Sequence, residues 1–446
     1  MVDGRAGMSG AASPGGKLLG ILLGIYALGY LDRQIISLLV MPLRRDLGIS
    51  DIEVSVLQGL GFVVSYTVCG LFMGYLVDRV SRRAIIATGL AIWSVCSALS
   101  ALADSYTQLL IARVGVGAGE AALLPAAYSM ISDAYPREKL SRAMAVFSLG
   151  AIVGGAIALG IGGMIAAFAG QAGTVILPVI GTVYPWQTVF LFIGALGIPA
   201  LGAIVLLHEP ERTANLESGG GSSADGHFVR HWRFYLCHIA GFSLLCTMSA
   251  AAVAWQPAFF QRAYGWEIER VGAVLGVIHL VAGVLGMLGG GWLADRLQQR
   301  GHTDGHMRIY TIAIPVLAVS AWLAFRPEIL WLSIFGICVI SVIAPFIAVA
   351  ASALALGTPA NRRGFASAVF LFIYNLLGFG LGPTAAAILI DAPAPLGGSL
   401  GAALASLFVL IAPFATLLFI LGMAPMRRAV EATAAVTKGG ANSPVP

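Results

Sequence analysis

Four Asp, Glu or Arg side chains stand well inside long apolar runs of this 446-residue sequence. Asp32 and Arg33 are neighbours in the first run, and Arg113 and Glu120 stand in the fourth. A charge near the middle of a bilayer costs about 2.5 to 3.5 kcal/mol on insertion scales, so charges kept there usually serve a function. A carboxylate whose arginine partner moves away changes its affinity for a proton. We therefore expect Asp32 and Glu120 to exchange a coupling proton, with Arg33 and Arg113 as their charge partners.

Helix geometry restricts the pairing of these charges. Adjacent helical side chains point about 100° apart, so Asp32 and Arg33 cannot neutralise each other on a straight helix. Arg113 and Glu120 are seven positions apart and share one helix face, where they can meet the first pair. Two arrangements stay open: Asp32 with Arg113 and Arg33 with Glu120, or a crossed set in which Arg113 is shared. A static network that only fixes helix packing is the alternative to proton exchange.

The composition indicates a polytopic α-helical membrane protein. Hydrophobic residues make up 58% of the chain and charged residues 11%, whereas a soluble domain carries roughly 25% charged residues. Apolar runs of about 20 residues predict twelve spanning helices. The expected helices cover residues 17–41, 54–77, 84–103, 107–131, 141–168, 187–207, 234–260, 271–293, 308–325, 328–357, 365–390 and 399–424.

The distribution of Lys and Arg predicts the orientation of these helices. Of the 26 Lys and Arg residues, 19 fall on the side of the N-terminus, 5 on the opposite side and 2 inside helices. Both termini are therefore expected in the cytoplasm. We expect a cytoplasmic tail (1–16), a six-helix bundle (17–207), a cytoplasmic linker (208–233), a second six-helix bundle (234–424) and a cytoplasmic tail (425–446). The excess of Arg over Lys, 23 to 3, favours a bacterial source and hence the inner membrane.

A sequence repeat relates the two expected bundles. The segment GYLVDRVSRR begins at Gly74, and GWLADRLQQR begins at Gly291, at an offset of 217 residues. An aspartate and arginines at a helix end can form contacts that break when the helices move. Anchoring to anionic lipid is the simpler interpretation of the arginines. The expected gating residues are Gly74, Asp78, Arg79, Arg82, Arg83, Asp295, Arg296 and Arg300.

These motifs resemble those of a known family. The two loop segments and Arg113-Val-Gly-Val-Gly117 are similar to signature motifs of the major facilitator superfamily, and Tyr30-Leu-Asp-Arg33 resembles the Spinster proteins within it. The resemblance implies two bundles that alternate access across the membrane. It also implies that Asp78 latches onto the helix at 365–390 and that Asp295 plays the mirrored role near 141–168. The latter helix lacks the Gly-Pro typical of drug antiporters, which argues against multidrug antiport.

If the fold follows this family, a central cavity lies between the bundles. The residues that line it indicate the class of substrate. Few of the expected lining residues offer amides, so an amphiphile is favoured over a sugar or peptide, with its head near Arg33 or Arg113. The Spinster resemblance implies lysophospholipids or sphingoid phosphates; another small organic or aromatic anion is the runner-up, and a non-transporting receptor the third reading. Packing is the alternative for each aromatic ring and for His279. The expected lining residues are Tyr26, Tyr30, Gln58, Tyr66, Trp255, His279, Tyr374 and Asn375.

The sequence gives no sign of an enzyme. It contains no Ser-His-Asp set, metal-ligand spacing or phosphate-cradling loop, so we expect no catalytic residue, cofactor or metal. The five cysteines fall in apolar runs and predict no disulfide framework. The expected partners are membrane lipid, an amphipathic small molecule and protons. We expect no nucleic-acid partner and a monomeric chain.

Overall fold

The computed structural model describes residues 14–177, 181–212, 225–326, 328–359 and 362–441. In this part of the chain, twelve helices are long and apolar enough to span a membrane. The predicted all-helical fold with twelve spans is confirmed. One short antiparallel hairpin, β1 (Val175–Leu177) and β2 (Gly181–Val183), is an addition that the sequence had not predicted.

The first half of the chain builds one helical bundle in which two spans are interrupted. The second span breaks at Gly59, and the fourth breaks at Ala121 and Ala122. The helices are α1 (Pro14–Leu38), α2 (Val40–Leu47), α3 (Asp51–Gln58), α4 (Leu60–Val77), α5 (Arg82–Ser100), α6 (Tyr106–Glu120), α7 (Leu123–Ala134), α8 (Arg137–Ala172) and α9 (Pro185–Val205).

The second half builds a similar bundle with two further interruptions. Its tenth span breaks around Pro345, which has no N–H to continue the helix. Its eleventh span contains a π-helical turn, Asn375–Gly380. The helices are α10 (Asp225–Arg230), α11 (Trp232–Tyr264), α12 (Ile268–Gln299), α13 (Gly305–Ala324), α14 (Leu330–Ile343), α15 (Ile347–Leu356), α16 (Arg363–Tyr374), α17 (Leu381–Ile390) and α18 (Leu400–Ala441).

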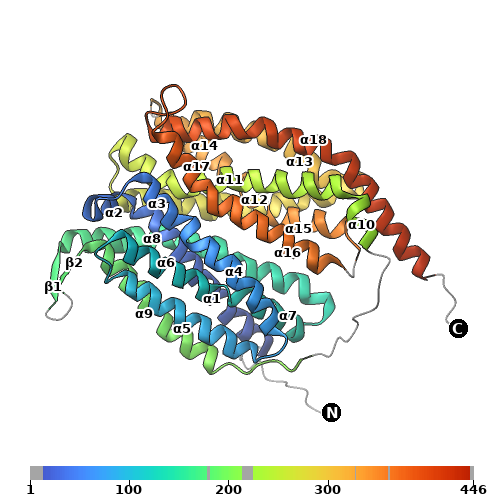
Figure 1. Ribbon diagram of the computed structural model, residues 1–446, viewed down its shortest axis with the longest axis horizontal. Coiled ribbons are helices and arrows are strands. Elements are labelled where there is room, and N and C mark those ends of the chain that lie inside the picture. The colour runs from blue at the N-terminus through green and yellow to red at the C-terminus, as the bar shows by residue number, and fades with distance from the viewer. Residues whose placement is uncertain (1–13, 178–180, 213–224, 327, 360–361, 442–446) are drawn as a thin grey trace, which may run out of the picture.

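The two bundles lie side by side (Figure 1). The start of α1, the end of α9, α10 and the end of α18 lie towards one end of the molecule, which we call the inner end. The opposite end, with α2 and the hairpin, is called the outer end. The last helix continues to Ala441, well beyond the predicted boundary at 424, and Arg427 on this extension lies 3.5 Å from Asp304.

The two bundles contact each other at the outer end through an ion pair, a hydrogen bond and a close backbone approach. Arg262 on α11 binds Asp51 at the start of α3, with Nη2–Oδ1 and Nη1–Oδ2 distances of 2.5 and 3.0 Å. Ser55 Oγ donates to Thr384 Oγ1 at 3.1 Å. A Cβ added at Gly59 would lie 2.5 Å from the Gly380 carbonyl oxygen, so the backbones touch at this point.

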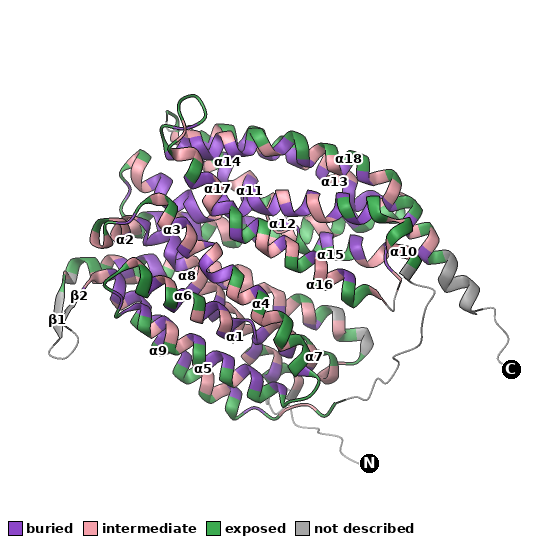
Figure 2. Cartoon of the chain, viewed as in Figure 1, coloured by how far each residue is buried: buried purple, intermediate pink, exposed green. Residues whose placement is uncertain are grey.

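The inner half of the molecule is less tightly closed. Figure 2 shows exposed residues on α4 and α16 towards the inner end. The sides of the helices that pack against each other within a bundle are mostly buried. Phe72 and Tyr75 on α4 are 66% and 62% exposed, and Phe365 on α16 is 61% exposed. The structure is therefore closed at the outer end, whereas a Cβ added at Gly70 or Gly74 on the inner half of α4 would meet nothing within 4 Å.

Candidate proton and substrate site

Two ion pairs join α1 to α6 inside the first bundle. Arg113 Nη1 lies 2.6 Å from Asp32 Oδ1, and Arg33 contacts Glu120 Oε2 through Nε at 2.7 Å and Nη2 at 2.6 Å. Of the two arrangements that the sequence left open, the uncrossed one is present. Asp32, Arg113 and Glu120 are buried, while the Arg33 side chain is 25% exposed. We call these residues the four-charge network.

Small residues let the two helices approach closely enough to form these pairs. A Cβ added at Gly29, one turn before Arg33, would lie 3.2 Å from Glu120 Oε2. Gly117 on α6 packs directly against the Phe62 carbonyl of α4, where a side chain would clash. The glycines around Arg113 and Glu120 thus fit a close approach of helices, which small residues permit inside membranes.

Each carboxylate of the network has one oxygen in an ion pair and one oxygen without a hydrogen-bond partner among the described residues. Asp32 Oδ2 and Glu120 Oε1 are buried and have no hydrogen-bond partner among the described residues, and the same is true of Arg113 Nε. Buried polar atoms are usually satisfied, so three orphans in one network are unusual. A buried carboxylate oxygen without a donor is a position where a proton can be held without breaking the existing contact.

Arg33 is the member of the network that faces an aromatic enclosure. Its guanidinium carbon lies 4.4 Å from the centre of the Phe62 ring, 4.5 Å from Tyr66 and 5.1 Å from Tyr30. Such distances give cation–π attraction. Tyr26 extends the group, with its ring centre 5.2 Å from that of Tyr30. The expected lining residues Tyr26, Tyr30 and Tyr66 are therefore gathered around Arg33.

The side chain of Gln58 contacts the backbone of the other bundle on the outer side of the site. Its Nε2 donates to the Ala254 carbonyl of α11 at 3.2 Å. Gln34 makes a parallel contact, from Nε2 to the Val253 carbonyl at 3.3 Å. Both amides thus bind backbone across the two bundles on the outer side of Arg33. The sequence could not show this, because an amide in an apolar run fits a ligand or a neighbouring helix equally well.

Two of the expected lining residues in the second half are buried in packing. Trp255 is fully buried and donates its indole N–H to the Pro383 carbonyl at 2.9 Å. Tyr374 is 6% exposed and packs among Phe346, Phe370 and Phe379. Both rings are thus buried in this conformation, and their place in the wall of a cavity stays a prediction.

His279 and Asn375 remain at partly exposed positions. His279 Nε2 lies 2.9 Å from Gln256 Oε1, which links α12 to α11. Gln256 is fully buried, and its Nε2 has no partner among the described residues. Asn375 is partly exposed and begins the π turn. Gln256 is one of the few polar side chains that the sequence places in the expected lining helices.

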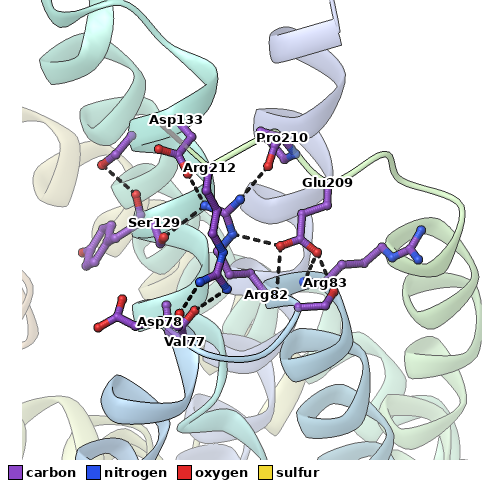
Figure 3. A network of polar contacts seen from close by, with 12 residues as sticks. Val77, Asp78, Arg82, Arg83, Ser129, Asp133, Glu209, Pro210 and Arg212 are labelled. Carbon is purple, nitrogen blue, oxygen red and sulfur yellow. Dashed lines mark hydrogen bonds and ion pairs between the residues drawn. The ribbon is translucent and has the colours of Figure 1, made fainter. Parts of the chain in front are cut away.

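A polar network at the inner end includes Asp78 and Arg82, two of the expected gating residues of the first half (Figure 3). Arg82 is buried and contacts Asp133 of α7, Ser129 Oγ at 3.2 Å and the Pro210 carbonyl at 2.6 Å. Its Nε lies 2.9 Å from Glu209 Oε1. Arg82 therefore ties α5 to α7 and to the chain that follows α9, all within one bundle.

Glu209 is a residue of this network that the sequence did not single out. It lies in the expected linker (208–233), and its Oε2 accepts from Ser81 Oγ at 2.5 Å while its Oε1 accepts from the Arg82 N–H at 3.0 Å. Burial alone would raise its pKa, but hydrogen bonds from Ser81 and Arg82 outweigh burial and lower the pKa of Glu209 to about 2. The sequence offered one signal: Glu209 is an acid just after the sixth span, and the third span begins with Arg82 and Arg83.

Asp78 does not make the contact that the family resemblance implies. Its carboxylate is exposed and has no ion pair within the described chain, while its carbonyl and those of Val77 and Val80 accept from Arg212. Asp295 in the second copy of the motif is exposed as well. No hydrogen bond or ion pair joins either aspartate side chain to the opposite bundle within the described chain, so the implied latches are not formed here.

The remaining gating residues lie exposed near the inner end. Arg79 stacks on Tyr75, with 3.5 Å from its guanidinium carbon to the ring centre, and Arg296 lies 5.5 Å from the Trp292 ring. Arg83 donates to the Val205 and Leu207 carbonyls at 3.3 and 3.2 Å. Gly74 and Arg300 are exposed, and a Cβ added at Gly74 would meet nothing within 4 Å.

Several known proteins have related sequences. A "MFS-type efflux pump" of Mycolicibacterium smegmatis is 29% identical over 384 residues, which covers 84% of both chains. A "Probable L-galactonate transporter" of Escherichia coli is 27% identical and covers 68% of this chain and 66% of its own. The "Protein spinster" of Drosophila melanogaster is 27% identical over 69% of this chain, which spans about half (49%) of the fly protein.

The fold and the family agree with these relatives. A solved bacterial homologue of the human lysosomal transporter Spinster, in an inward-facing and unoccupied conformation, matches with a TM-score of 0.76 at 22% identity, over 94% of this chain and 98% of that chain. The model of the Major Facilitator Superfamily matches residues 22–383. The chain therefore belongs to the Major Facilitator Superfamily, a family of membrane transporters and not of enzymes, and it resembles the Spinster proteins.

Proposed function

We propose that this protein is a proton-coupled secondary transporter that moves an amphipathic, lipid-like anion by alternating access. The observation that carries the proposal is the partly exposed Arg33, which shares its carboxylate partner Glu120 with the proton site and lies among three aromatic rings. The chain is a multi-pass membrane protein whose bacterial relatives indicate the inner membrane. Its inner end is then the cytoplasmic side, as the Lys and Arg distribution predicts.

The coupling follows from the charges of the network. While Glu120 is ionised, it neutralises Arg33 through two contacts to one oxygen. A proton on Glu120 removes that negative charge, so the guanidinium is left to attract an anionic head group. Asp32 and Arg113 form the second pair, fully buried behind the first. Proton exchange at either carboxylate changes the charge balance that an incoming anion meets.

The aromatic surroundings favour an amphiphile over a polar solute. Around Arg33 the neighbours are rings, and the nearby amides of Gln34 and Gln58 are already bound to α11 carbonyls. A sugar would leave its hydroxyl groups without partners in such a site, at a cost of about 1 to 3 kcal/mol for each buried group. A head group with one or two charges and an apolar chain matches the walls better.

The proposal is tested with purified protein in liposomes that carry a pH gradient. We expect Asp32→Asn to abolish gradient-driven accumulation of an anionic lysolipid while binding of the lysolipid persists, because binding uses Arg33. Asp104→Asn, which removes an exposed acid outside the helices, is the matched control and should leave accumulation unchanged. Unchanged accumulation by Asp32→Asn would rule out proton coupling through this residue.

A small organic anion is the second candidate substrate. The E. coli relative is described as a probable L-galactonate transporter, and Arg33 could bind the carboxylate of a small acid as well as a phosphate. A thermal-shift screen separates the two candidates, since a ligand that binds the folded state raises the unfolding temperature. Stabilisation by sugar acids and not by lysolipids would favour the small anion. A proton flux elicited by either class separates a transporter from a receptor.

A further inference from the structure

A groove between α13 and α18 opens on the side of the second bundle that is turned away from the first bundle (Figure 1). Its volume is about 750 Å³, and its walls are almost entirely apolar. On α13 the lining residues Pro315, Ala318, Val319 and Trp322 follow a spacing of three or four positions, so they share one helix face. The wall on α18 has the same spacing between residues 409 and 420. The groove is thus a continuous apolar surface that spans two helices.

The residue types along the groove explain why the two helices leave space between them. Pro315 and Pro413 lie inside α13 and α18 and line opposite walls. A proline inside a helix removes a backbone hydrogen bond and bends the helix. Ala318 and Ala412 also line the groove, and their side chains are too small to fill it.

The equivalent helices of the first bundle pack more closely. α5 and α9 contain the third and sixth spans, as α13 and α18 contain the ninth and twelfth. A Cβ added at Gly194 of α9 would lie 2.8 Å from the Ser94 carbonyl oxygen of α5, so the two backbones nearly touch there. Gly197 packs against Ser94 as well. The groove therefore comes from the sequence of the second bundle and not from the architecture that the bundles share.

The length and depth of the groove match one leaflet of a bilayer. From Val409 to Ile420 the wall on α18 measures about 16 Å along the helix axis. A hydrocarbon core of about 30 Å gives about 15 Å for each leaflet. Trp322 stands just before the end of α13 at Ala324, so the groove begins near the outer end. One acyl chain of the outer leaflet has a suitable length and polarity for this space.

A positive charge stands at the outer end of the groove. The guanidinium carbon of Arg326 lies 4.0 Å from the centre of the Trp322 ring, and this ring lines the groove. Arg326 is exposed and forms no ion pair within the described chain, although the exposed acid Glu328 follows it closely. Cation–π attraction holds the guanidinium at the ring. An arginine near a membrane surface attracts anionic lipid by about 1 kcal/mol, so the charge favours an anionic head group over a zwitterionic one.

We propose that the groove binds an anionic phospholipid of the outer leaflet, with its phosphate at Arg326 and one acyl chain along α13 and α18. This lipid is a bound ligand and not the transported substrate, because α13 and α18 lie apart from α1 and α6, which carry the four-charge network. The inference therefore goes beyond the proposed function and holds whichever anion is transported.

Photo-crosslinking tests the site directly. The full-length protein is reconstituted in phosphatidylcholine liposomes that contain a phosphatidylglycerol with a diazirine in one acyl chain, and mass spectrometry locates the label after irradiation. We expect added phosphatidylglycerol to reduce the label at Val319 and Leu417, and added phosphatidylcholine to leave it in place. Ile198, which is 73% exposed on α9, should respond equally to both lipids. Equal responses at all three positions would show ordinary lipid contact and overturn the site.

A matched pair of arginine variants tests the head group. Arg270 is the control for Arg326, because it also stacks on a tryptophan at the outer end, 4.2 Å from the ring centre of Trp266, but Trp266 is buried. We expect Arg326→Gln to raise the fraction of phosphatidylglycerol needed for half-maximal competition about fivefold, equivalent to about 1 kcal/mol. Arg270→Gln should leave this fraction unchanged. An unchanged fraction for Arg326→Gln would overturn the assignment of the head group.

A matched pair of tryptophan variants tests the acyl chain. Val319→Trp fills the groove, whereas Val316→Trp places the same ring on another exposed face of α13. We expect Val319→Trp to abolish the competable label at Leu417 and Val316→Trp to retain it. Retention by both variants would overturn the groove as the site of the chain. A dimer of the unmodified protein in light scattering, with no label at Leu417, would show that a second copy covers the groove and overturn the lipid.

Discussion

Asp32 and Arg33 are adjacent in the chain yet have different partners. Their side chains leave α1 in different directions, and each meets its opposite charge on α6. Of the two pairs, only Arg33–Glu120 includes a partly exposed side chain. The deeply buried Asp32–Arg113 pair contributes little net stability, because desolvation offsets its Coulomb energy. Its retention in a membrane helix is easier to explain by a task than by stability.

Glu209 gives a prediction in which pH sets the size of the effect on stability. Its pKa in the folded protein is about 2, below the ordinary value of 4.5, so the folded state keeps the carboxylate ionised at lower pH than the unfolded state does. The stabilisation is therefore complete above about pH 4.5 and disappears as the pH falls towards 2. We expect Glu209→Gln to lower stability by roughly 1 to 2 kcal/mol near neutral pH and to have no effect near pH 2.

Thermal unfolding in detergent across this pH range measures the difference. Glu211→Gln is the matched control, since Glu211 is an exposed acid two residues further along the chain. An unfolding difference for Glu209→Gln that stayed constant from pH 7 to pH 2 would contradict the assigned cause, because a purely steric effect of the amide does not titrate.

The pairing of charged side chains could be predicted from the sequence only where few opposite charges are available. Inside the membrane, the charges available to Asp32 and Arg33 were few, and spacing on α6 left two arrangements. At the inner end many acids and arginines compete, so no spacing rule could connect Arg82 with Asp133 and Glu209. For Trp255 and Tyr374 the sequence is ambiguous for another reason: an aromatic ring in an apolar helix has the same sequence signature whether it faces a cavity or the core.

At the scale of elements, the sequence predicts the spans but not their interruptions. Apolar length determines that a segment crosses a membrane, and twelve such segments are present in the described chain. Local breaks depend on what the neighbouring helix needs. Gly59 separates α3 from α4, and the π turn Asn375–Gly380 ends at Gly380, where these two spans touch. The β1–β2 hairpin was missed because its apolar run resembles neither an alternating strand nor a full span.

Gly59 gives the prediction at this scale. A Cβ there would lie 2.5 Å from the Gly380 carbonyl oxygen and 2.9 Å from that of Phe379, so a larger residue forces the second and eleventh spans apart at the outer end. We expect Gly59→Val to favour a state that is open on the outer side. In a cysteine-free background, a cysteine at Ser55, which is buried here, should react faster with a membrane-impermeant maleimide added outside.

The control separates this contact from a general effect of valine in a helix. Gly202 lies on α9, and a Cβ added there would meet nothing within 4 Å, so Gly202→Val should leave the labelling rate of the cysteine at Ser55 unchanged. If Gly59→Val also left the rate unchanged, the contact between Gly59 and Gly380 would not determine closure of the outer end.

At the scale of the whole molecule, the two halves share an architecture but not a chemistry. The offset of 217 residues places Ser249 opposite Asp32 and Ile337 opposite Glu120, so the charge pairs have no counterpart in the second bundle. Gln299 likewise stands opposite Arg82. Proton handling is therefore expected in the first bundle, while the second bundle offers Gln256 and His279 near the cavity. The motion between them then depends on the few contacts that cross the interface.

The ion pair between Asp51 and Arg262 is such a contact, and it gives the last prediction. It joins α3 to α11 through two hydrogen bonds of 2.5 and 3.0 Å, and opening of the outer end must break it. We expect Asp51→Asn and Arg262→Gln each to raise the population that is open outside. The distance between spin labels at Ile52 and Ile388, exposed positions on α3 and α17, should shift towards longer values.

A double-mutant cycle shows whether the pair itself is responsible. Because either substitution removes the same contact, the double variant Asp51→Asn/Arg262→Gln should open no further than either single variant, with a coupling energy of about 0.5 to 3 kcal/mol. Arg44 lies 3.4 Å from Asp51 but belongs to the same bundle, so Arg44→Gln should have little effect on opening. Additive effects of the two single substitutions would instead mean that each residue acts through its own surroundings. The outer end would then be held mainly by backbone contacts such as that of Gly59 with Gly380.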